Sequence, residues 1–345
     1  MSSWSLIALT TALLTWFLVG VFRRLNAPKP NGTVFAHQLA AEDRLADGGK
    51  IPISVNYHFT RQCNMSCGFC FHTATTSHVV PRDEAKRGMA LLKQAGTRKI
   101  NFAGGEPFLY PKLLGCLIDY CKEIGIESVS IVSNGSKVTE HFLQKHGRNI
   151  DILAISCDSF DEKTNLQIGR GTGSNVAQLH RVKSWCDEYN VKFKLNTVVC
   201  HLNWMEDMNE HISVLSPARW KCFQVLIVEG ENESAERLRD ATKFTVTSEE
   251  FEHFVEKHRH QASLVPESNQ LMAKSYLILD EYMRFLDRTG KLPSKSILDV
   301  GVDKALASVY WDVDGFYERG GVYDWHAHPA GSTCGDELQS KKLQW

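Results

Sequence analysis

Three cysteines stand close together in this chain of 345 residues, at Cys63, Cys67 and Cys70. Three thiolates on one loop could bind three irons of a [4Fe–4S] cluster and leave the fourth iron without a protein ligand. They could instead bind zinc, with His72 as the fourth ligand. Zinc loops usually carry two separated cysteine pairs, and the sequence has no second pair. The spacing therefore favours an iron–sulfur cluster over zinc.

The net charge and the distribution of the other cysteines narrow the possible functions. The formal net charge is −1, so the chain as a whole has no bulk attraction for nucleic acid or anionic membranes. Any phosphate binding must come from lysines and arginines placed locally. The other cysteines are scattered, several of them in apolar runs, as expected for buried thiols. They are Cys116, Cys121, Cys157, Cys186, Cys200, Cys222 and Cys334.

Short β-rich segments alternate with helical segments between residues 51 and 228, which predicts parallel strands joined by right-handed crossovers. We therefore expect an α/β fold, a partial (β/α)6 barrel. The predicted strands are Ile51–Phe59, Lys99–Ala103, Ser128–Ser133, Asp151–Cys157, Lys192–Val199 and Cys222–Val228. The predicted helices are Asp83–Gln94, Pro111–Ile124, Glu140–His146, Val176–Tyr189 and Met205–Leu215.

Several of these strands have one polar face. The outer face of a parallel barrel is covered by helices and must be apolar. Since side chains alternate between the two faces of a strand, the polar faces should point into the lumen, where a bound polar ligand would justify them. These faces carry Ser54, Asn56 and His58 on the first strand, Lys99 and Asn101 on the second, and Lys192, Lys194 and Asn196 on the fifth.

The amino-terminal segment differs in kind from the rest. No charge occurs from Trp4 to Phe22, a length at the lower limit of a membrane span, and Arg23 and Arg24 follow. A signal peptide is disfavoured because the start lacks a basic region and no clear cleavage site follows. A transmembrane anchor and a helix lying in the membrane surface both remain open, each with a cytosolic body. We expect a membrane-anchoring helix at 1–24, a linker at 25–50, the barrel at 51–228, and an extension at 229–345 that closes the barrel and ends in a targeting tail.

Two motifs resemble the radical SAM superfamily, whose enzymes use S-adenosylmethionine (SAM) and a [4Fe–4S] cluster. Phe69 before the last cysteine matches the signature C-x3-C-x-φ-C, where φ is aromatic. The segment Phe102-Ala-Gly-Gly-Glu-Pro107 resembles the motif whose backbone and glutamate hold the SAM amino group. The resemblance implies a radical SAM barrel with SAM contacts at successive strand ends. The implied contacts are Gly104, Gly105, Glu106, Ser133, Asn134, Ser156 and Arg170.

Longer segments are similar to the viperin family of antiviral nucleotide dehydratases, over roughly residues 50–325. They lie at 54–63, 67–73, 151–160, 265–269, 275–285 and 296–300. This resemblance implies a lyase that converts CTP to 3′-deoxy-3′,4′-didehydro-CTP, a chain terminator of viral RNA polymerases. Some relatives use UTP or another nucleotide. The chain departs from the family at Ala103, where a serine is common, and between about 324 and 339.

The same resemblance implies roles for further residues. Tyr276 resembles the family's proton donor for the leaving hydroxyl, with a core tyrosine on a helix as the alternative. Arg319–Tyr323 would fold over the nucleotide base as a flap. Trp345 would be recognised by the cytosolic iron–sulfur assembly machinery. The expected substrate contacts, with Lys99 added for its place on a polar face, are Asn56, His58, Lys99, Lys194, Asn196, Arg219 and Lys221.

Two other functions fit parts of the sequence. A radical SAM enzyme of cofactor biosynthesis would share the cysteine and glycine motifs but not the lysine and arginine set. A membrane-bound antiviral scaffold acting through partners would not require intact cluster cysteines. With the anchor, the expected location is the cytosolic face of the endoplasmic reticulum and of lipid droplets.

Overall fold

A computed structural model describes residues 50–287, 289 and 291–326. The predicted anchoring helix at 1–24, the linker up to residue 49 and the tail with Trp345 lie outside the described residues. Within the described ranges, no helix has the length and apolar character needed to cross a bilayer.

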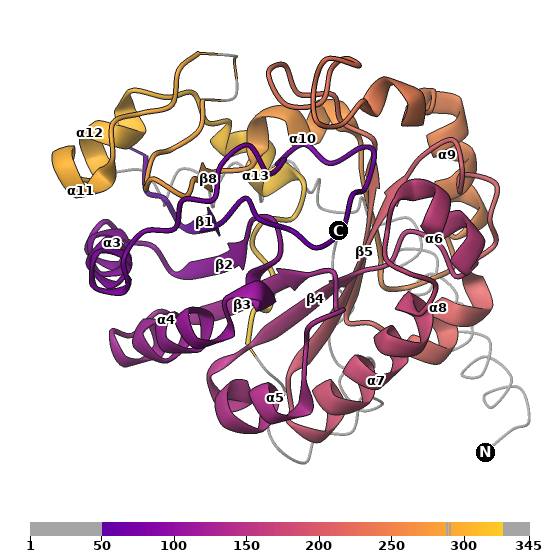
Figure 1. Ribbon diagram of the computed structural model, residues 1–345, viewed down its shortest axis with the longest axis horizontal. Helices are drawn as coiled ribbons and strands as arrows, with labels where there is room; N and C mark the ends of the chain where they lie inside the picture. Colours follow the sequence, from indigo (N-terminus) through magenta and orange to yellow (C-terminus); the bar gives the residue numbers. More distant parts are fainter. Residues whose placement is uncertain (1–49, 288, 290, 327–345) are drawn as a thin grey trace, which may run out of the picture.

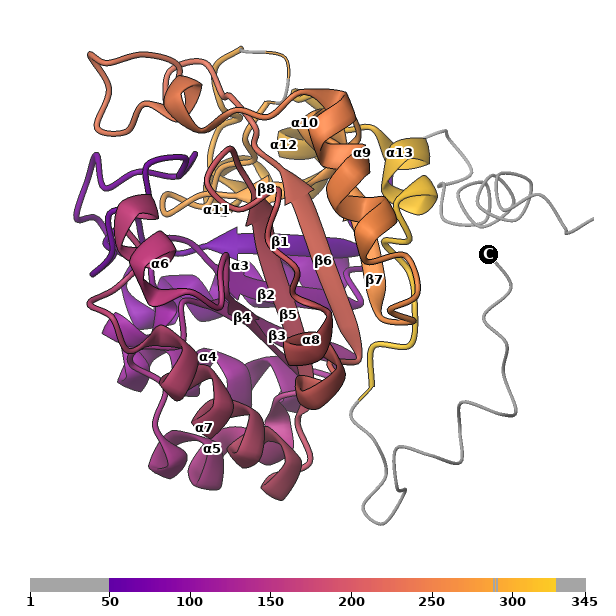
Figure 2. The same cartoon turned by 90° about the vertical axis from the view of Figure 1, so that its right-hand side faces the viewer.

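The described residues form one eight-stranded sheet in which all neighbouring strands are parallel. Its order is β7-β6-β5-β4-β3-β2-β1-β8, and it curls into a half-barrel with β7 and β8 at the edges (Figures 1 and 2). The strands are β1 (Ser54–His58), β2 (Lys99–Ala103), β3 (Ser128–Ser133), β4 (Ile152–Ser156), β5 (Lys192–Val199), β6 (Arg219–Gln224), β7 (Leu264–Glu267) and β8 (Ile278–Leu279).

The six predicted strands are all present, which confirms the partial barrel. The sixth begins at Arg219, earlier than the predicted start at Cys222. The edge strands β7 and β8 come from the segment expected to be an extension that closes the barrel, and they belong to its sheet. Pro266 lies within β7 and has no N–H to donate, which suits an edge position. Both strands are too short for the alternation of side chains to reveal them in the sequence.

Helices cover the outer side of the half-barrel, where α3, α4, α5 and α7 lie in succession (Figure 1). Five helices match predictions closely, whereas α6 follows β4 unpredicted. The connecting helices are α3 (Arg82–Gln94), α4 (Pro111–Glu123), α5 (Glu140–His146), α6 (Glu162–Ile168), α7 (Asn175–Glu188) and α8 (Asn209–Leu215). Short 3-10 turns lie at Pro107–Leu109, Gly147–Asn149 and Ala241–Phe244.

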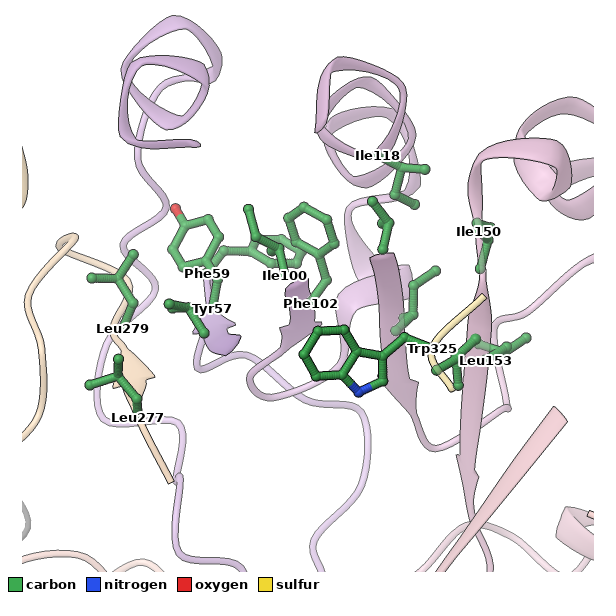
Figure 3. Packing of buried hydrophobic residues seen from close by; sticks show 14 of the residues in the cluster. Tyr57, Phe59, Ile100, Phe102, Ile118, Ile150, Leu153, Leu277, Leu279 and Trp325 are labelled. Carbon is green, nitrogen blue, oxygen red and sulfur yellow. The ribbon is translucent and has the colours of Figure 1, made fainter. Parts of the chain in front are cut away.

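The core lies between the strands and these helices. Tyr57, Phe102 and Trp220 point outward from β1, β2 and β6 and are fully buried. Burial of each such side chain contributes roughly 1.5–3 kcal/mol to folding. In Figure 3, Tyr57 and Phe102 lie on the side of the strands that faces the helices, and Ile118 of α4 points toward them. Because the apolar side chains face outward, the alternate polar side chains of the same strands face the lumen.

The segment after β6 supplies the two edge strands and closes the amino end of the half-barrel. The carbonyl of Trp325 accepts a hydrogen bond of 3.2 Å from Ser128, which begins β3. Asp324 forms a 3.0 Å ion pair with Lys192, which begins β5. Residues 324 and 325 therefore cross the barrel floor. The helices of this region are α9 (Ser248–Lys257), α10 (Asn269–Ser275), α11 (Ile297–Val300), α12 (Val302–Ala307) and α13 (Val313–Glu318).

Candidate active site

One cavity runs through the lumen, and the three clustered cysteines line it just beyond the carboxyl end of β1. Backbone hydrogen bonds hold their loop against the end of α6, from Gly68 N to Ile168 O (2.8 Å) and from Ser66 N to Gly169 O (3.0 Å). A methyl group on Gly68 would lie 2.1 Å from the ring of Phe244. The loop is therefore tightly covered, and Gly68 is needed for that contact.

A buried arginine ties the same loop to the carboxyl-terminal region. Arg61 pairs with Glu281 and with Glu231, at 2.9 Å in each case. Truncating one partner of such a buried pair is strongly destabilising, because the other charge is left without a partner. Arg61 therefore fixes the approach of the chain to Cys63.

The chemistry of the cysteines fits a positively charged metal group. Burial raises the pKa of Cys67 to about 12, so a thiolate there requires compensating positive charge, which irons would supply. Among the described residues, no three His, Cys, Asp or Glu side chains are grouped to hold a single metal ion. A cluster spreads its thiolates over different irons and does not need that grouping. His72, the fourth ligand of the zinc alternative, packs edge-on against His58 with ring centres 4.5 Å apart.

The two glycines after β2 allow a backbone contact with the cysteine loop. Gly105 N donates to Thr60 O at 2.7 Å. A methyl group on Gly104 would lie 2.3 Å from Thr60 O, and one on Gly105 would lie 2.1 Å from Gln62 O. Gly104 also has a φ of +134°. Both glycines line the cavity, and their close approach is to the chain that leads into the cysteines.

Glu106 is not among the cavity-lining residues, although the sequence assigns it to SAM. It is fully buried, and its carboxylate accepts from Ser133 Oγ (2.8 Å) and from the backbone N–H groups of Asn134 (2.7 Å) and Phe108 (3.0 Å). Burial raises the pKa of this carboxyl group against the effect of its donors. In this structure Glu106 organises the end of β3 behind the cavity wall.

The other residues expected to contact SAM do line the cavity near the cysteines: Ser133, Asn134, Ser156 and Arg170. Arg170 forms a buried ion pair with Asp158, which also lines the cavity and accepts from the backbone N–H of Val198 at 2.9 Å. Asp158 is therefore occupied on both oxygens, and the cavity presents amides and hydroxyls rather than a free carboxylate at this point.

A belt of amides and hydroxyls crosses the middle of the lumen. Asn101 donates to Asn56 Oδ1 at 2.8 Å and accepts from Ser130 Oγ at 2.7 Å. The Oδ1 atom of Asn196 is buried and has no hydrogen-bond partner among the residues that the structure describes. His58 lines the same cavity. Oriented amides with an open acceptor are suited to the hydroxyl groups of a sugar.

Cationic side chains gather toward the amino end of the strands, away from the cysteines. Lys99 begins β2 and Lys194 lies early in β5, whereas Lys221 on β6 is in register with Asn196; all three line the cavity. Burial lowers the pKa of each of these lysines to about 7. Several buried cations this close together favour a multiply charged anion as ligand.

Arg219 lies behind the cavity wall rather than on it, although the sequence predicts it as a substrate contact. Tyr323 covers it, with the ring centre 4.2 Å from the guanidinium carbon. The Tyr323 hydroxyl accepts hydrogen bonds from Lys99 (3.1 Å) and Lys194 (3.5 Å). The segment Arg319–Tyr323 was predicted to cover the nucleotide base. In the structure its Tyr323 contacts the side chains that are predicted to bind phosphate.

Tyr276 lines the cavity directly after α10 and belongs to a buried polar network. Its hydroxyl donates to Glu267 at 2.6 Å and accepts from Lys221 at 3.0 Å. Arg319 lies over its ring at 3.7 Å. Tyr276 is therefore a wall residue with its hydroxyl in a charged environment, unlike an ordinary core tyrosine.

Sequence reasoning missed Glu267 as a site residue and used Arg319 only as part of a flap. Glu267 ends β7, an edge strand that gave no recognisable pattern, and Arg319 caps α13. Glu267 did lie inside one of the segments that resemble the viperin family, which was the available signal.

Comparison with known proteins agrees with this geometry. The Radical SAM superfamily pattern matches residues 57–215. The chain is 58% identical to the S-adenosylmethionine-dependent nucleotide dehydratase RSAD2 of Danio rerio over 79% of this chain and 78% of that protein. It is 54% identical to the protein of the same name from Siniperca chuatsi, over 88% and 85% of the two chains.

Solved structures share the fold at low sequence identity. Streptococcus suis SuiB bound to S-adenosylmethionine superimposes with a TM-score of 0.57 at 16% identity, over 79% of this chain and 70% of that one. The enzyme anSMEcpe with bound AdoMet gives 0.57 at 15% identity, over 74% and 80%.

Proposed function

Because this chain belongs to the viperin family of S-adenosylmethionine-dependent nucleotide dehydratases, we propose that it removes water from the ribose of CTP, giving 3′-deoxy-3′,4′-didehydro-CTP. The observation that carries the proposal is the cationic end of the lumen. Lys99, Lys194 and Lys221 are buried there, and in the described part of the chain only Lys221 of the three has a carboxylate within ion-pair distance, that of Glu267. A triphosphate supplies the missing negative charge. The resemblance in sequence, rather than a base contact, is what favours CTP over UTP.

The ends of the cavity suit the two halves of this reaction. Cys63, Cys67 and Cys70 would hold the [4Fe–4S] cluster, and the SAM contacts would be Gly104, Gly105, Ser133, Asn134, Ser156 and Arg170 around it. Glu106, directly behind Ser133 and Asn134, would complete this set. When bound, the cluster and SAM would supply the radical chemistry that hydrogen removal from the ribose requires.

The protein's own side chains position the nucleotide between these ends. The lysines hold the triphosphate at the barrel floor, while Asn56 and Asn196 face the ribose. A ribose bound by the amide belt would have its carbon atoms oriented toward the cysteine end of the cavity. Residues 319–325 would exclude water at the amino end of the half-barrel. Tyr276 can give its hydroxyl proton to the leaving 3′ hydroxyl, which departs as water.

The test is anaerobic incubation of the reconstituted protein with SAM, dithionite and each nucleoside triphosphate separately. We expect 5′-deoxyadenosine together with a nucleotide lighter by one water, with CTP the best substrate. A product from UTP alone would move the assignment to UTP. No dehydrated product from any of the four would reject the enzymatic proposal and favour the scaffold alternative.

We also propose that residues 4–24 tether the protein to the cytosolic face of the endoplasmic reticulum and of lipid droplets. Their uncharged composition followed by Arg23 and Arg24 supports this. Trp345, as a terminal aromatic residue, would bind the iron–sulfur assembly machinery. Deletion of residues 1–24 should release the protein from membranes, and deletion of Trp345 should lower the iron content of protein made in cells without releasing it.

A further inference from the structure

A carboxylate with no assigned role lies behind the cavity wall, against the lining residues Lys221 and Tyr276. Glu267 has 0% of its surface exposed. It accepts from Lys221 Nζ in a buried ion pair and from the Tyr276 hydroxyl at 2.6 Å, and Arg319 lies 4.0 Å away. Three potential donors to the substrate therefore converge on one buried anion.

The hydrogen bonds among these groups have a direction. Lys221 donates both to Glu267 and to the Tyr276 oxygen, the latter at 3.0 Å. Tyr276 in turn donates its proton to Glu267. If the Tyr276 hydroxyl turned into the cavity, Glu267 would still keep its bond to Lys221, and Lys221 would still point at the Tyr276 oxygen.

We propose that Glu267 is a positioning residue that keeps Lys221 protonated and aimed at Tyr276, so that Lys221 restores the proton that Tyr276 gives away. The inference rests on the proposed dehydration. The Tyr276 O–H bond breaks and its proton joins the 3′ hydroxyl, which leaves as water. A Lys221 N–H bond then breaks and the Tyr276 O–H bond re-forms. Neutral Lys221 takes a proton from solvent after product release. No electron passes through this relay; the reducing electron is that of the iron–sulfur cluster.

The electrostatics of Lys221 support a need for Glu267. Burial lowers the pKa of Lys221 to about 7, and Glu267 opposes that shift. The remaining charged groups around Lys221 are Arg219 on the same strand, Arg319 after α13 and Lys194 on β5, all of which favour the neutral amine. Although burial opposes it, Lys221 and Arg319 hold the pKa of Glu267 at about 2, so Glu267 stays charged. Without Glu267, Lys221 would lose its proton at a lower pH.

The first test compares Glu267→Gln, which keeps shape and removes charge, with wild type. We expect kcat for dehydration to fall at least tenfold and the alkaline limb of the kcat/KM profile to move to lower pH. Glu206→Gln is the matched control, since Glu206 is a partly buried carboxylate that accepts from Ser159 and Phe160 away from the cavity. A Glu267→Gln protein with lost activity but an unmoved pH profile would mean a merely structural role and would overturn the proposal.

The second test uses Lys221→Arg, which keeps a positive charge but cannot release a proton, since the pKa of arginine is above about 12. We expect nucleotide binding within about threefold of wild type and continued 5′-deoxyadenosine formation, with fewer dehydrated nucleotides per 5′-deoxyadenosine. A wild-type product ratio would overturn the relay. NMR titration of the Lys221 ammonium in wild type and Glu267→Gln measures the proton directly. This titration does not depend on turnover, so it tests the role of Glu267 separately from the dehydratase assignment. Failure of that assignment would appear as an absence of product from the wild-type protein.

Discussion

The centre of the Tyr323 ring lies 4.2 Å from the guanidinium carbon of Arg219, although the two residues are far apart in the sequence. A desolvated contact of this kind contributes up to about 2 kcal/mol. Since the Tyr323 hydroxyl also accepts from Lys99 and Lys194, one side chain aligns three cations at the barrel floor. Tyr323 is thus part of the proposed triphosphate site.

Replacing Tyr323 should weaken nucleotide binding. We expect Tyr323→Ala to raise KM for the nucleotide about tenfold, equivalent to about 1.4 kcal/mol, with a smaller effect on kcat. Tyr323→Phe keeps the ring on Arg219 and should have a smaller effect. Steady-state kinetics across nucleotide concentrations measure this, with the exposed Tyr310→Ala as control. An unchanged KM in Tyr323→Ala would show that the cations do not depend on Tyr323.

Nucleotide affinity should fall as pH rises. Burial lowers the pKa of Lys99, Lys194 and Lys221 to about 7, and a triphosphate would bind their charged forms. Above pH 7 binding must therefore take up protons, and Kd should rise between pH 6.5 and 8.5, by up to about tenfold per pH unit for each neutral lysine. Calorimetry in buffers of different ionisation enthalpy measures the uptake. Proton release on binding would contradict the assignment of these lysines.

Substitution of Gly104 should lower the free energy of unfolding more than substitution of Gly301, another glycine at positive φ. In Gly104→Ala the added methyl group meets Thr60 O at 2.3 Å, whereas Gly301, also at positive φ, has open space around it. We expect Gly301→Ala to cost about 1–2 kcal/mol of unfolding free energy. Gly104→Ala should cost more and should also lower iron content, because Thr60 leads into the cysteine loop. Denaturant unfolding and iron analysis measure both. Equal stability losses in the two variants would contradict the close backbone contact.

Cluster binding should depend on Cys67 and not on cysteines elsewhere. Cys67→Ala is expected to lose iron, sulfide and all turnover after anaerobic reconstitution, because one iron loses its thiolate. Cys116→Ala, on α4 and away from the cavity, should retain iron and activity. Iron retained at wild-type level in Cys67→Ala would refute cluster ligation by this loop.

Local patterns were enough to predict much of the protein. The spacing of Cys63, Cys67 and Cys70 indicates a metal loop because ligands to one group must be close in the chain. The alternation of Lys194 and Asn196 with Phe193 and Leu195 indicates which face is buried, because a strand has a period of two. The lumen lining by Asn56, His58, Lys99, Lys194 and Asn196 follows from that rule, whereas Lys221 was named from the family resemblance.

Tertiary structure decided what no local pattern could. Lys221 and Glu267 are 46 positions apart, and Lys194 and Tyr323 are 129 apart, so their contacts depend on how separate segments meet. Glu106 has the motif position of a SAM contact, and only the structure shows that its carboxylate also accepts from three donors of the protein, two of them at the end of β3. The half-barrel and most of its polar lining could be predicted from the order of the elements and from periodicity along each strand. The pairing of charges in the cavity could not be predicted in this way. It depends on how β7, α10 and residues 319–325 pack against the cavity, because electrostatic interactions depend on distance in space and not on separation along the chain.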